Sequence, residues 1–324
     1  MTTIDHRLCT APMMDWSDRH CRYFFRQLAP HAVVYTEMVT TGALIHGDVD
    51  RHLRFDAAEH PVALQLGGSD PGELAYCARL GHQYGYDEIN LNCGCPSERV
   101  QRGAFGASLM AEPMLVAQCV AAMRDATPIP VTVKHRLGID SIETYGFVRD
   151  FVGTLAEAGC QTFLVHARNA VLRGLSPKAN REVPPLKYEF VHRLKRDFPE
   201  LQIVLNGGIG EVEFAAAELE HLDGVMLGRT AYHDPHVLAQ LDARLFGGVP
   251  RSREAVVDRM HDYAGREMAG GTPLRAIARH MLGLYHGRPN ARSWRRMLSD
   301  PLLLSANRPD LLREALPRPE AVPA

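Results

Sequence analysis

Cys95 lies in the stretch of this chain whose residue types are best suited to chemistry. The stretch reads Asn90-Leu91-Asn92-Cys93-Gly94-Cys95-Pro96 and begins within an apolar run that is typical of a buried strand. Pro96 fixes its own backbone and restricts Cys95, and Gly103 and Gly106 then allow the segment to bend and move. A thiol on such a loop suits a residue that must approach a substrate. The alternative is a buried structural cysteine, which is the commoner fate of a free thiol.

Two glycine turns later in the chain have the residue types of a phosphate site. They are Asn206-Gly207-Gly208 and Gly228-Arg229, and both follow short apolar runs. Backbone amides of glycine-rich loops bind phosphate after the last two strands of many TIM barrels, and Arg229 adds a charge with bidentate geometry. Lys134 and His166 would face such a phosphate, which suits FMN, because a lysine can offset the charge that develops on a flavin during reduction. Turns that only reverse the chain, and a histidine packed in the core, are the alternatives.

The elements that must position these residues alternate between strands and helices. Asp70-Pro71-Gly72-Glu73 has the capping acid and first-turn proline of a helix start, and residues 113–123 and 145–158 continue the helical pattern. Such alternation predicts a parallel sheet. The predicted strands are Cys9–Met13, Val33–Met38, Val62–Leu66, Glu88–Asn92, Val131–Lys134, Thr162–His166, Ile203–Asn206 and Gly224–Leu227.

Eight strand–helix units over about 240 residues predict a TIM barrel. A doubly wound sheet is the weaker alternative, because no G-x-G-x-x-G turn follows the first strand. Polar residues at nearly every strand end favour the barrel, since this face carries the site in TIM barrels. These residues are Asp15, Glu37, Gln65, Asn90, Asn92, Lys134, Arg136, His166, Arg168, Asn206 and Arg229.

The alternation of strands and helices ends near residue 242. Gly247-Gly248-Val249-Pro250 has the composition of a linker, and residues 253–268, 273–286 and 291–298 are predicted helices. We therefore expect a barrel domain, residues 1–242, followed by a small helical domain, residues 243–324, with a loose tail from Pro309.

Charge is distributed unevenly between these two parts. Residues 243–324 hold 14 arginines, no lysine and 8 acidic residues, a net charge of +6, whereas residues 1–242 carry −8. A basic part of this kind suggests an anionic partner. Arginines beside aromatic residues are typical of RNA contacts, and the set here is Arg275, Arg279, Arg292, Trp294, Arg295 and Arg296. A merely solvated arginine face is the alternative, since the chain favours arginine over lysine throughout.

Composition describes an ordinary folded protein. The 324 residues are 46% hydrophobic, which is enough for a sizeable core, and length alone suggests about two domains. Residues 1–10 hold no apolar run and no later stretch reaches ~18 apolar residues, so neither a signal peptide nor a membrane span is predicted. Seven scattered cysteines without a C-x-x-C pair predict reduced thiols and no metal site. We expect a cytoplasmic monomer.

Several motifs resemble those of the A-type tRNA-dihydrouridine synthases. The resemblance extends from about Cys9 to about Leu298, and a related cysteine loop occurs in dihydroorotate dehydrogenases. Cys93 and His135 are less typical of the family, yet neither replaces a motif residue. The motifs that carry the resemblance are Ala11–Arg22, Tyr35–Thr40, Gln65–Pro71, Asn90–Gly106 and Gly174–Glu182.

The resemblance implies a flavin enzyme that reduces uridine in tRNA, with NADPH as the reductant. It implies Cys95 as the proton donor. The implied FMN-binding residues are Pro12, Met13, Met14, Gln65, Lys134, His166, Asn206, Gly207, Gly208, Gly228 and Arg229. The implied tRNA-binding residues are Asn92, Lys178, Arg181, Arg292 and Arg295.

The implied reaction makes chemical sense at these residues. A hydride would pass from N5 of FMN to C6 of uracil, and Cys95 would protonate C5. An unperturbed thiol, with a pKa near ~8.5, is mostly protonated at neutral pH, as an acid must be. The A-type resemblance implies uridines 20 and 20a of the D-loop. Extruding a base costs free energy, which phosphate contacts of the basic C-terminal domain could offset.

Two other functions fit parts of the sequence. A dihydroorotate dehydrogenase is also a flavin barrel with a loop cysteine, but it has no use for residues 243–324. A tRNA-binding barrel without turnover would use those residues and would need no flavin. A yellow purified protein would argue against the binding protein, and tight tRNA binding would argue against the dehydrogenase.

Overall fold

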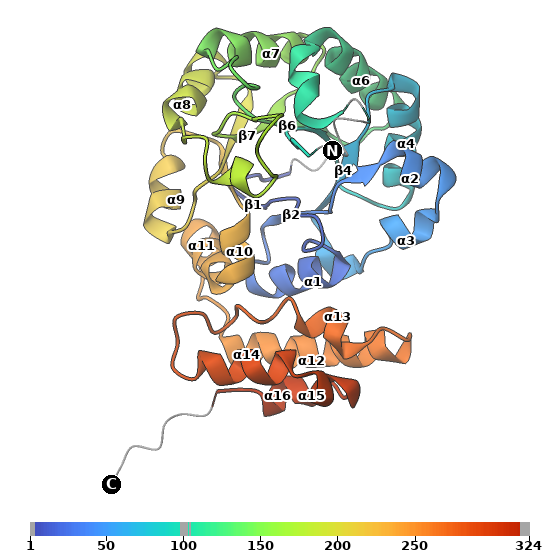
Figure 1. The fold of residues 1–324 in the computed structure, drawn as a ribbon, viewed down its shortest axis with the longest axis vertical. Coiled ribbons are helices and arrows are strands. Elements are labelled where there is room, and N and C mark those ends of the chain that lie inside the picture. Colours follow the sequence, from blue (N-terminus) through green and yellow to red (C-terminus); the bar gives the residue numbers. More distant parts are fainter. Residues whose placement is uncertain (1–3, 98–102, 104, 318–324) are drawn as a thin grey trace.

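Short apolar runs form a closed parallel barrel, and an all-helical part packs beside it (Figure 1). The computed structural model describes residues 4–97, 103 and 105–317. Most strand residues are buried, as expected for a parallel sheet that is covered by helices. The strands are β1 (Leu8–Thr10), β2 (Val33–Tyr35), β3 (Val39–Thr40), β4 (Val62–Gly67), β5 (Glu88–Cys93), β6 (Val131–His135), β7 (Thr162–His166), β8 (Gln202–Asn206) and β9 (Gly224–Leu227).

The sheet closes on itself in the order β2-β1-β9-β8-β7-β6-β5-β4, and β4 pairs with β2 through Val34 and Val62. All of these pairings are parallel, and β3 adds a short extension to β4. The predicted TIM barrel is therefore confirmed, and the doubly wound sheet is excluded because the sheet has no open edge at β2 or β4. Closure brings the carboxyl ends of all eight barrel strands to one face.

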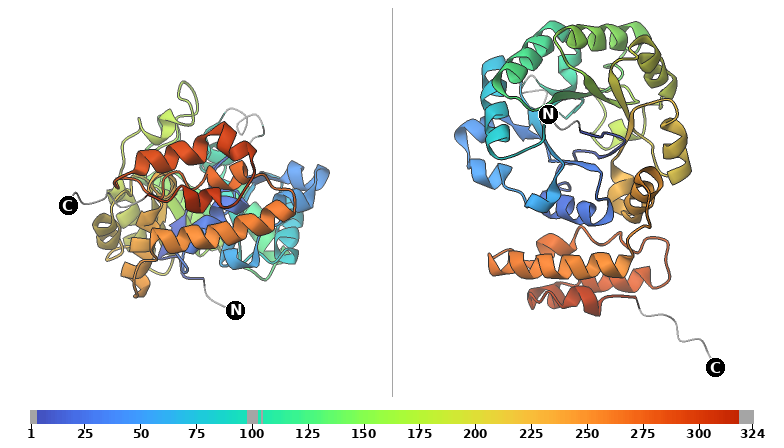
Figure 2. Two further views of the ribbon diagram at one scale, coloured as in Figure 1. Left: turned by 90° about the horizontal axis from the view of Figure 1, so that it is seen from below. Right: turned by 180° about the vertical axis from the view of Figure 1, so that it is seen from behind.

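Helices surround the barrel and make up the appended part (Figures 1 and 2). The predicted start at Asp70 is confirmed, since its side chain accepts a hydrogen bond from Glu73 N at 2.9 Å. The helices are α1 (Arg19–Leu28), α2 (Thr41–His46), α3 (Val49–Leu53), α4 (Pro71–Gln83), α6 (Pro113–Ala126), α7 (Tyr145–Glu157), α8 (Tyr188–Asp197), α9 (Val212–Glu218), α10 (Arg229–His233), α11 (His236–Phe246), α12 (Arg253–Ala269), α13 (Leu274–Ala278), α14 (Ala291–Ser299), α15 (Pro301–Ser305) and α16 (Leu311–Glu314).

Apolar side chains pack both inside the barrel and between the barrel and its helices. The interior cluster contains Cys9, Val33, Tyr35, Leu164 and Met226, all fully buried. The larger cluster joins the other strand side chains to the surrounding helices and continues without a break into the C-terminal helices. Across the described residues, no helix is both long and apolar enough to span a bilayer.

Two predicted strands were too long, and one predicted helix was as well. β1 ends at Thr10 because Pro12 has no N–H for a ladder bond, and β2 ends at Tyr35. The predicted helix over residues 273–286 is helical only as α13 and continues as turns. A Cβ at Gly283 would meet the His233 carbonyl oxygen at 2.5 Å, so the chain there is packed too closely for a side chain.

The chain end is more ordered than the sequence predicted. The tail from Pro309 was expected to be loose, but α16 packs on α12 with Leu311 and Leu312 buried, so this prediction was wrong for the described residues up to 317. Apolar anchors inside a proline-rich stretch explain the difference. Helix α11 continues through residue 242 to Phe246, and the division into two functional domains stays a prediction.

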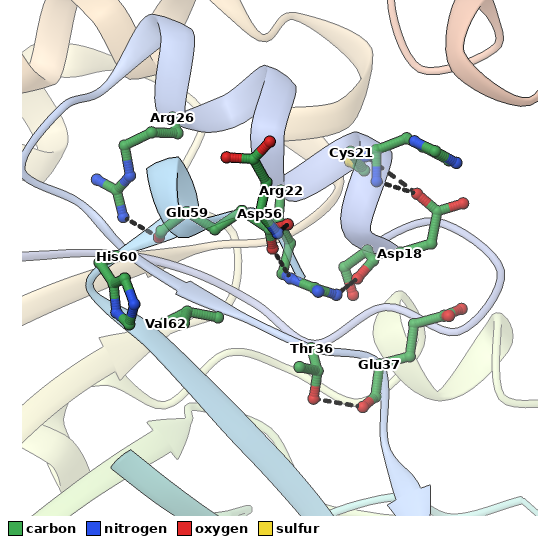
Figure 3. A network of polar contacts seen from close by, with 12 residues as sticks. Asp18, Cys21, Arg22, Arg26, Thr36, Glu37, Asp56, Glu59, His60 and Val62 are labelled. Atoms are coloured by element: carbon green, nitrogen blue, oxygen red, sulfur yellow. Dashed lines mark hydrogen bonds and ion pairs between the residues drawn. The ribbon is translucent and has the colours of Figure 1, made fainter. Parts of the chain in front are cut away.

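Two arginines on α1 fasten the chain segment that enters β4 (Figure 3). Arg22 Nε donates to Glu59 Oε2 at 2.6 Å, and both side chains are almost fully buried. Arg26 donates to a set of backbone carbonyls that includes those of Glu59 and Pro61. Burying a charge is costly unless it is paired and hydrogen-bonded, so these contacts define how residues 56–61 lie against the barrel.

Candidate active site

A cavity of about 1290 Å³ opens over the carboxyl ends of the barrel strands. Every residue that the sequence analysis assigned to catalysis or to the cofactor lines this cavity. These residues lie in β1, β4, β5, β6, β7, β8 and β9 or in the loops that follow these strands. Lys178, Arg292 and Arg295 do not line it. The sequence-predicted residues in its walls are Pro12, Met13, Met14, Gln65, Asn92, Cys95, Lys134, His166, Arg181, Asn206, Gly207, Gly208, Gly228 and Arg229.

The Cys95 turn is held by hydrogen bonds from three directions. Asn92 Oδ1 accepts from the backbone N–H groups of Gly94 and Cys95, each at 3.0 Å. Arg136 Nε donates to the Gly94 carbonyl at 2.9 Å, and Ala107 N donates to the Cys95 carbonyl at 2.9 Å. The thiol is partly exposed in the cavity, with Sγ 3.5 Å from Ser97 Oγ. Cys95 is therefore not a buried structural cysteine.

The rest of the loop after Cys95 is described only in part. Residues 98–102 and 104 lie outside the described residues, so the predicted hinge at Gly103 and Gly106 stays a prediction. Gly106 has a φ of +75°, a conformation that glycine adopts at little cost.

The neighbouring residues Cys93 and His135 belong to the core. Cys93 is fully buried, and burial raises the pKa of its thiol well above the usual range. His135 is also buried, its Nδ1 lies 2.6 Å from the Arg136 carbonyl oxygen, and burial lowers its pKa to about 4. Neither residue is part of the cavity wall.

A chain of buried amides and hydroxyls runs beneath the site from one strand to the next. Asn92 Nδ2 donates to Gln65 Oε1 at 2.8 Å, and Gln65 Nε2 donates to Asn90 Oδ1 at 2.7 Å. Asn90 Nδ2 donates to Thr132 Oγ1 at 2.8 Å, which in turn donates to Glu88 Oε1 at 2.6 Å. Gln65 and Asn92 are thus oriented by neighbours that never reach the cavity.

The turn after β8 has no room for side chains at its two glycines. Gly207 and Gly208 have φ values of +110° and +73°. A Cβ at Gly207 would meet His166 Cδ2 at 2.8 Å, and one at Gly208 would meet the Tyr188 hydroxyl oxygen at 2.5 Å. Only glycines can therefore keep both the backbone conformation and the space, and this backbone borders the cavity.

Several cationic side chains line the cavity, among them Lys134, Arg136 and Arg181. Burial, together with the charge of Arg136, lowers the pKa of Lys134 to about 7. Burial, with the charges of Arg136 and Lys134, holds the pKa of His166 well below its usual range, so its imidazole is neutral. Within the described part of the chain, the Lys134 ammonium has no ion-pair partner and the Arg181 guanidinium has none either. An anion in the cavity would supply one.

Arg136 is the site residue whose role the sequence analysis missed. It is almost fully buried, and burial lowers its pKa to about 10. Besides the Gly94 carbonyl, its guanidinium reaches the carbonyls of Asn169 and Asn180, each at 2.9 Å. It thereby joins the Cys95 turn to the segment between β7 and α8. Its position two residues after Lys134 was the available signal.

The guanidinium of Arg229, which was predicted to bind a phosphate, contacts protein groups instead. Its Nη1 forms an ion pair with Glu182 Oε1, and its Nη2 donates to the Arg181 carbonyl at 3.2 Å. A phosphate would have to compete with this carboxylate. The backbone of Gly228 and Arg229 still borders the cavity.

Comparison with known proteins places this geometry in a family. The family described as "Dihydrouridine synthase (Dus)" matches residues 9–316. A "tRNA-dihydrouridine(20/20a) synthase" of Pseudomonas syringae pv. tomato is 57% identical over 93% of this chain and 92% of the relative. The protein of the same description in Escherichia coli K12 is 57% identical over 91% of this chain and 86% of its own length. The chain belongs to the dihydrouridine synthase family.

Membership in the dihydrouridine synthase family confirms the resemblance on which the sequence analysis relied, and it disfavours a dihydroorotate dehydrogenase. The solved structure of morphinone reductase in complex with tetrahydroNAD is also similar, with a TM-score of 0.51 over 77% of this chain and 90% of that chain. At 13% sequence identity this similarity supports the barrel fold alone.

Three of the residues assigned to RNA, Lys178, Arg292 and Arg295, lie outside the cavity, whereas Asn92 and Arg181 line it. Lys178 and Arg181 are exposed on the segment between β7 and α8, and Arg292 and Arg295 are exposed on α14. No side-chain hydrogen bond or ion pair engages these four cations among the described residues. Asn92 is different, since its amide is already committed to Gln65 and to the Cys95 turn.

One predicted RNA contact of the synthase was wrong. Trp294 was expected to offer an aromatic surface beside the arginines, but it is fully buried and its Nε1 donates to the Met281 carbonyl at 2.9 Å. An amphipathic helix turns every third or fourth residue inward, and Trp294 occupies that position on α14. Arg279 is also less available than predicted, because it pairs with Asp18 at 2.6 Å.

Replacing Lys134 should change how stability depends on pH. Folding lowers the pKa of Lys134 from 10.5 to about 7. Between these two pH values Lys134 binds more protons in the unfolded chain than in the folded protein. The contribution of Lys134 to the free energy of unfolding therefore rises with pH. We expect the unfolding free energy of the ligand-free parent protein to increase, relative to that of Lys134→Met, as the pH rises from 7 to 9.5. Chemical denaturation at a series of pH values measures the difference, and a flat difference would contradict the low pKa.

Proposed function

We propose that this protein reduces uridines 20 and 20a of the tRNA D-loop to 5,6-dihydrouridine in the cytoplasm, with FMN as cofactor and NADPH as reductant. The observation that carries the proposal is a partly exposed thiol at the mouth of a strand-end cavity, which also holds cations without an ion-pair partner among the described residues. The names of the relatives support the substrate, and the amino-acid motifs support the cofactor. A monomer is sufficient for this assignment, since the cavity is built from one chain.

The residues around the cavity fit a flavin mononucleotide. The glycine turn after β8 and the backbone of Gly228 would take the phosphate, because both border the cavity and present the backbone amides of glycines. Gln65, Lys134 and His166 would face the polar edge of the ring system. Pro12, Met13 and Met14 would pack against it from the β1 side. A bound flavin supplies the hydride that adds to C6 of uracil.

Cys95 completes the reduction as a general acid. Hydride addition at C6 leaves an electron pair shared between C5 and the C4 carbonyl. The Sγ–H bond of Cys95 breaks, its proton forms the new C5–H bond, and the sulfur keeps the electron pair. The charges of Lys134 and Arg136 lie near enough to stabilise the thiolate. Because the thiol is partly exposed, solvent can return the proton.

The neighbouring residues hold the acid rather than react. Asn92 and Arg136 restrain the backbone on both sides of Gly94, so the thiol is presented from a defined turn. A misplaced acid loses much of its effect, because proton transfer requires hydrogen-bond reach. Gln65 and Asn90 act one step farther away, by orienting Asn92.

Replacing Cys95 by alanine tests this role. Cys95→Ala should retain FMN and be reduced by NADPH at the parent rate, whereas dihydrouridine formation should fall about 10²–10⁴-fold. The assay is mass spectrometry of nucleosides from unmodified tRNA, which detects the gain of two hydrogens. Cys93→Ala is the matched control, since that thiol is buried in the core and should leave turnover unchanged. Full activity of Cys95→Ala would show that another group gives the proton.

The RNA assignment predicts a specific loss of salt-dependent binding. Arg292→Ala with Arg295→Ala should weaken tRNA binding and flatten its salt dependence by about one unit of slope per lost phosphate contact. NADPH oxidation should stay unchanged. The control is Arg308→Ala with Arg313→Ala, which removes two arginines of the same helical part that already pair with Glu314 and Asp258. If both pairs of substitutions behave alike, the α14 arginines have no special contact with RNA.

A further inference from the structure

A short basic segment on α3 lines the same cavity as Cys95 and has no assigned role. Arg51, His52 and Arg54 border that cavity and are exposed. They belong to the connection between β3 and β4 rather than to a barrel strand end. The residues that fit a flavin come from other walls of the cavity, so this segment faces whatever lies beside the cofactor.

Among the described residues, the guanidinium groups of Arg51 and Arg54 have no partner, unlike those of the arginines close by. Arg19 pairs with Glu267, and Arg22 pairs with Glu59. In contrast, no hydrogen bond or ion pair engages the side chain of Arg51 or Arg54 within the described ranges. Asp48 caps the helix by accepting from the Arg51 backbone N–H at 3.1 Å, and among the described residues neither Asp48 nor Asp50 forms an ion pair with Arg51 or Arg54. The two charges are therefore available to a ligand.

The base of this segment is rigid. Leu53 is fully buried between the two arginines, and its carbonyl accepts from the Tyr86 hydroxyl at 3.0 Å. Directly after Arg54, residues 56–61 are fastened by the buried Arg22–Glu59 pair and by Arg26 (Figure 3). Arg51 and Arg54 thus project from an anchored backbone, which lowers the entropy lost when they bind a ligand.

The cavity is larger than one cofactor needs. Small-molecule sites commonly enclose about 300–1,000 Å³, whereas this one encloses about 1290 Å³. Its wall also includes Ala276 of α13, so it continues from the barrel mouth toward the C-terminal helices. Figure 1 shows α3 on one side of the barrel and the segment before α8 on the other, and the view from behind in Figure 2 agrees.

A nucleotide that enters this cavity from a folded RNA stays part of a continuous strand. Its backbone must therefore leave on two sides, with a phosphate on each. Lys178 and Arg181 stand on one side, and Arg51 and Arg54 stand on the other. Paired cationic walls would hold the backbone while the base is extruded, and this grip would offset the cost of unstacking.

We propose that Arg51 and Arg54, with His52, form a second phosphate-binding wall that grips the tRNA backbone beside the extruded uridine. This inference rests on the proposed function. It adds a contact on the barrel itself, remote in sequence from the basic C-terminal region. The dinucleotide reductant also carries phosphates, but tRNA is the better ligand because the segment adjoins the helical part: Asp56, two residues after Arg54, pairs with Arg266 of α12 at 3.7 Å.

The test compares two double variants with the parent protein. Arg51→Ala with Arg54→Ala removes the wall. The control is Arg196→Ala with Arg244→Ala, because these exposed arginines are also without side-chain partners in the described structure and lie away from the cavity. Arg51→Lys with Arg54→Lys keeps the charge. Each protein is assayed for affinity to unmodified tRNA from 0.05 to about 0.3 M salt, for dihydrouridine formation, and for the KM of NADPH in NADPH oxidation without RNA.

We expect the alanine pair to weaken tRNA binding at least about tenfold at 0.1 M salt and to reduce the salt slope by about two units. Its KM for NADPH should equal the parent value, the lysine pair should recover most of the affinity, and the control should lose little. A raised KM for NADPH with unchanged tRNA affinity would assign the segment to the dinucleotide and overturn the proposal. Parent-like behaviour in every assay would also overturn it.

Failure of this proposal is distinguishable from failure of the proposed function. If the parent forms dihydrouridine and the alanine pair binds tRNA as the parent does, only the α3 wall is wrong. If the parent neither binds tRNA nor forms dihydrouridine, the proposed function fails and the wall fails with it.

Discussion

The carboxylate of Glu88 gives direction to the hydrogen bonds on which the site depends. A carboxylate only accepts, so Thr132 must donate its hydroxyl proton to Glu88 and accept from Asn90 through its oxygen. That choice orients the Asn90 amide, which orients Gln65, which orients Asn92. The last group in this series of hydrogen bonds is Asn92 Oδ1, which accepts from the backbone N–H groups of Gly94 and Cys95. A buried polar group destabilises the fold unless it is hydrogen-bonded. Here the hydrogen bonds that satisfy the buried amides also hold the backbone turn that carries the Cys95 thiol.

Arg136 extends this restraint from the catalytic turn to the outer loops. Its guanidinium binds the Gly94 carbonyl on one side and the carbonyls of Asn169 and Asn180 on the other. Lys178 and Arg181 lie on either side of Asn180 in the sequence. The buried Arg136 side chain therefore restrains both the segment that carries these two cations and the turn that carries Cys95. A burial that lowers the pKa of an arginine is unfavourable by itself, and three carbonyl acceptors compensate for it.

The sequence predicted what depends on apolar periodicity and chain order. Eight strands, the barrel and the gathering of residues as distant as Met13, Cys95 and Arg229 follow from closing a parallel sheet. Contacts between side chains do not follow from such patterns. Nothing local indicates that Glu182 pairs with Arg229 or that Trp294 turns inward to Met281. The α3 segment was missed for a related reason, since it reaches the cavity from a connection and not from a strand end.

Net charge is a poor guide to where an RNA backbone would bind this protein. The excess of +6 in residues 243–324 suggests that the grip belongs to the helical part, yet several of its arginines are already engaged with carboxylates. Arg313 pairs with Asp258, and Arg279 pairs with an acid of the barrel, Asp18. The barrel, which carries −8, has at its mouth cations that no carboxylate of the described residues pairs with. A polyanion responds to unpaired charges within a Debye length, about 10 Å at 0.1 M salt, so pairing rather than summed charge decides where phosphates bind. The net-acidic barrel, residues 1–242, can therefore hold part of the anion-binding surface.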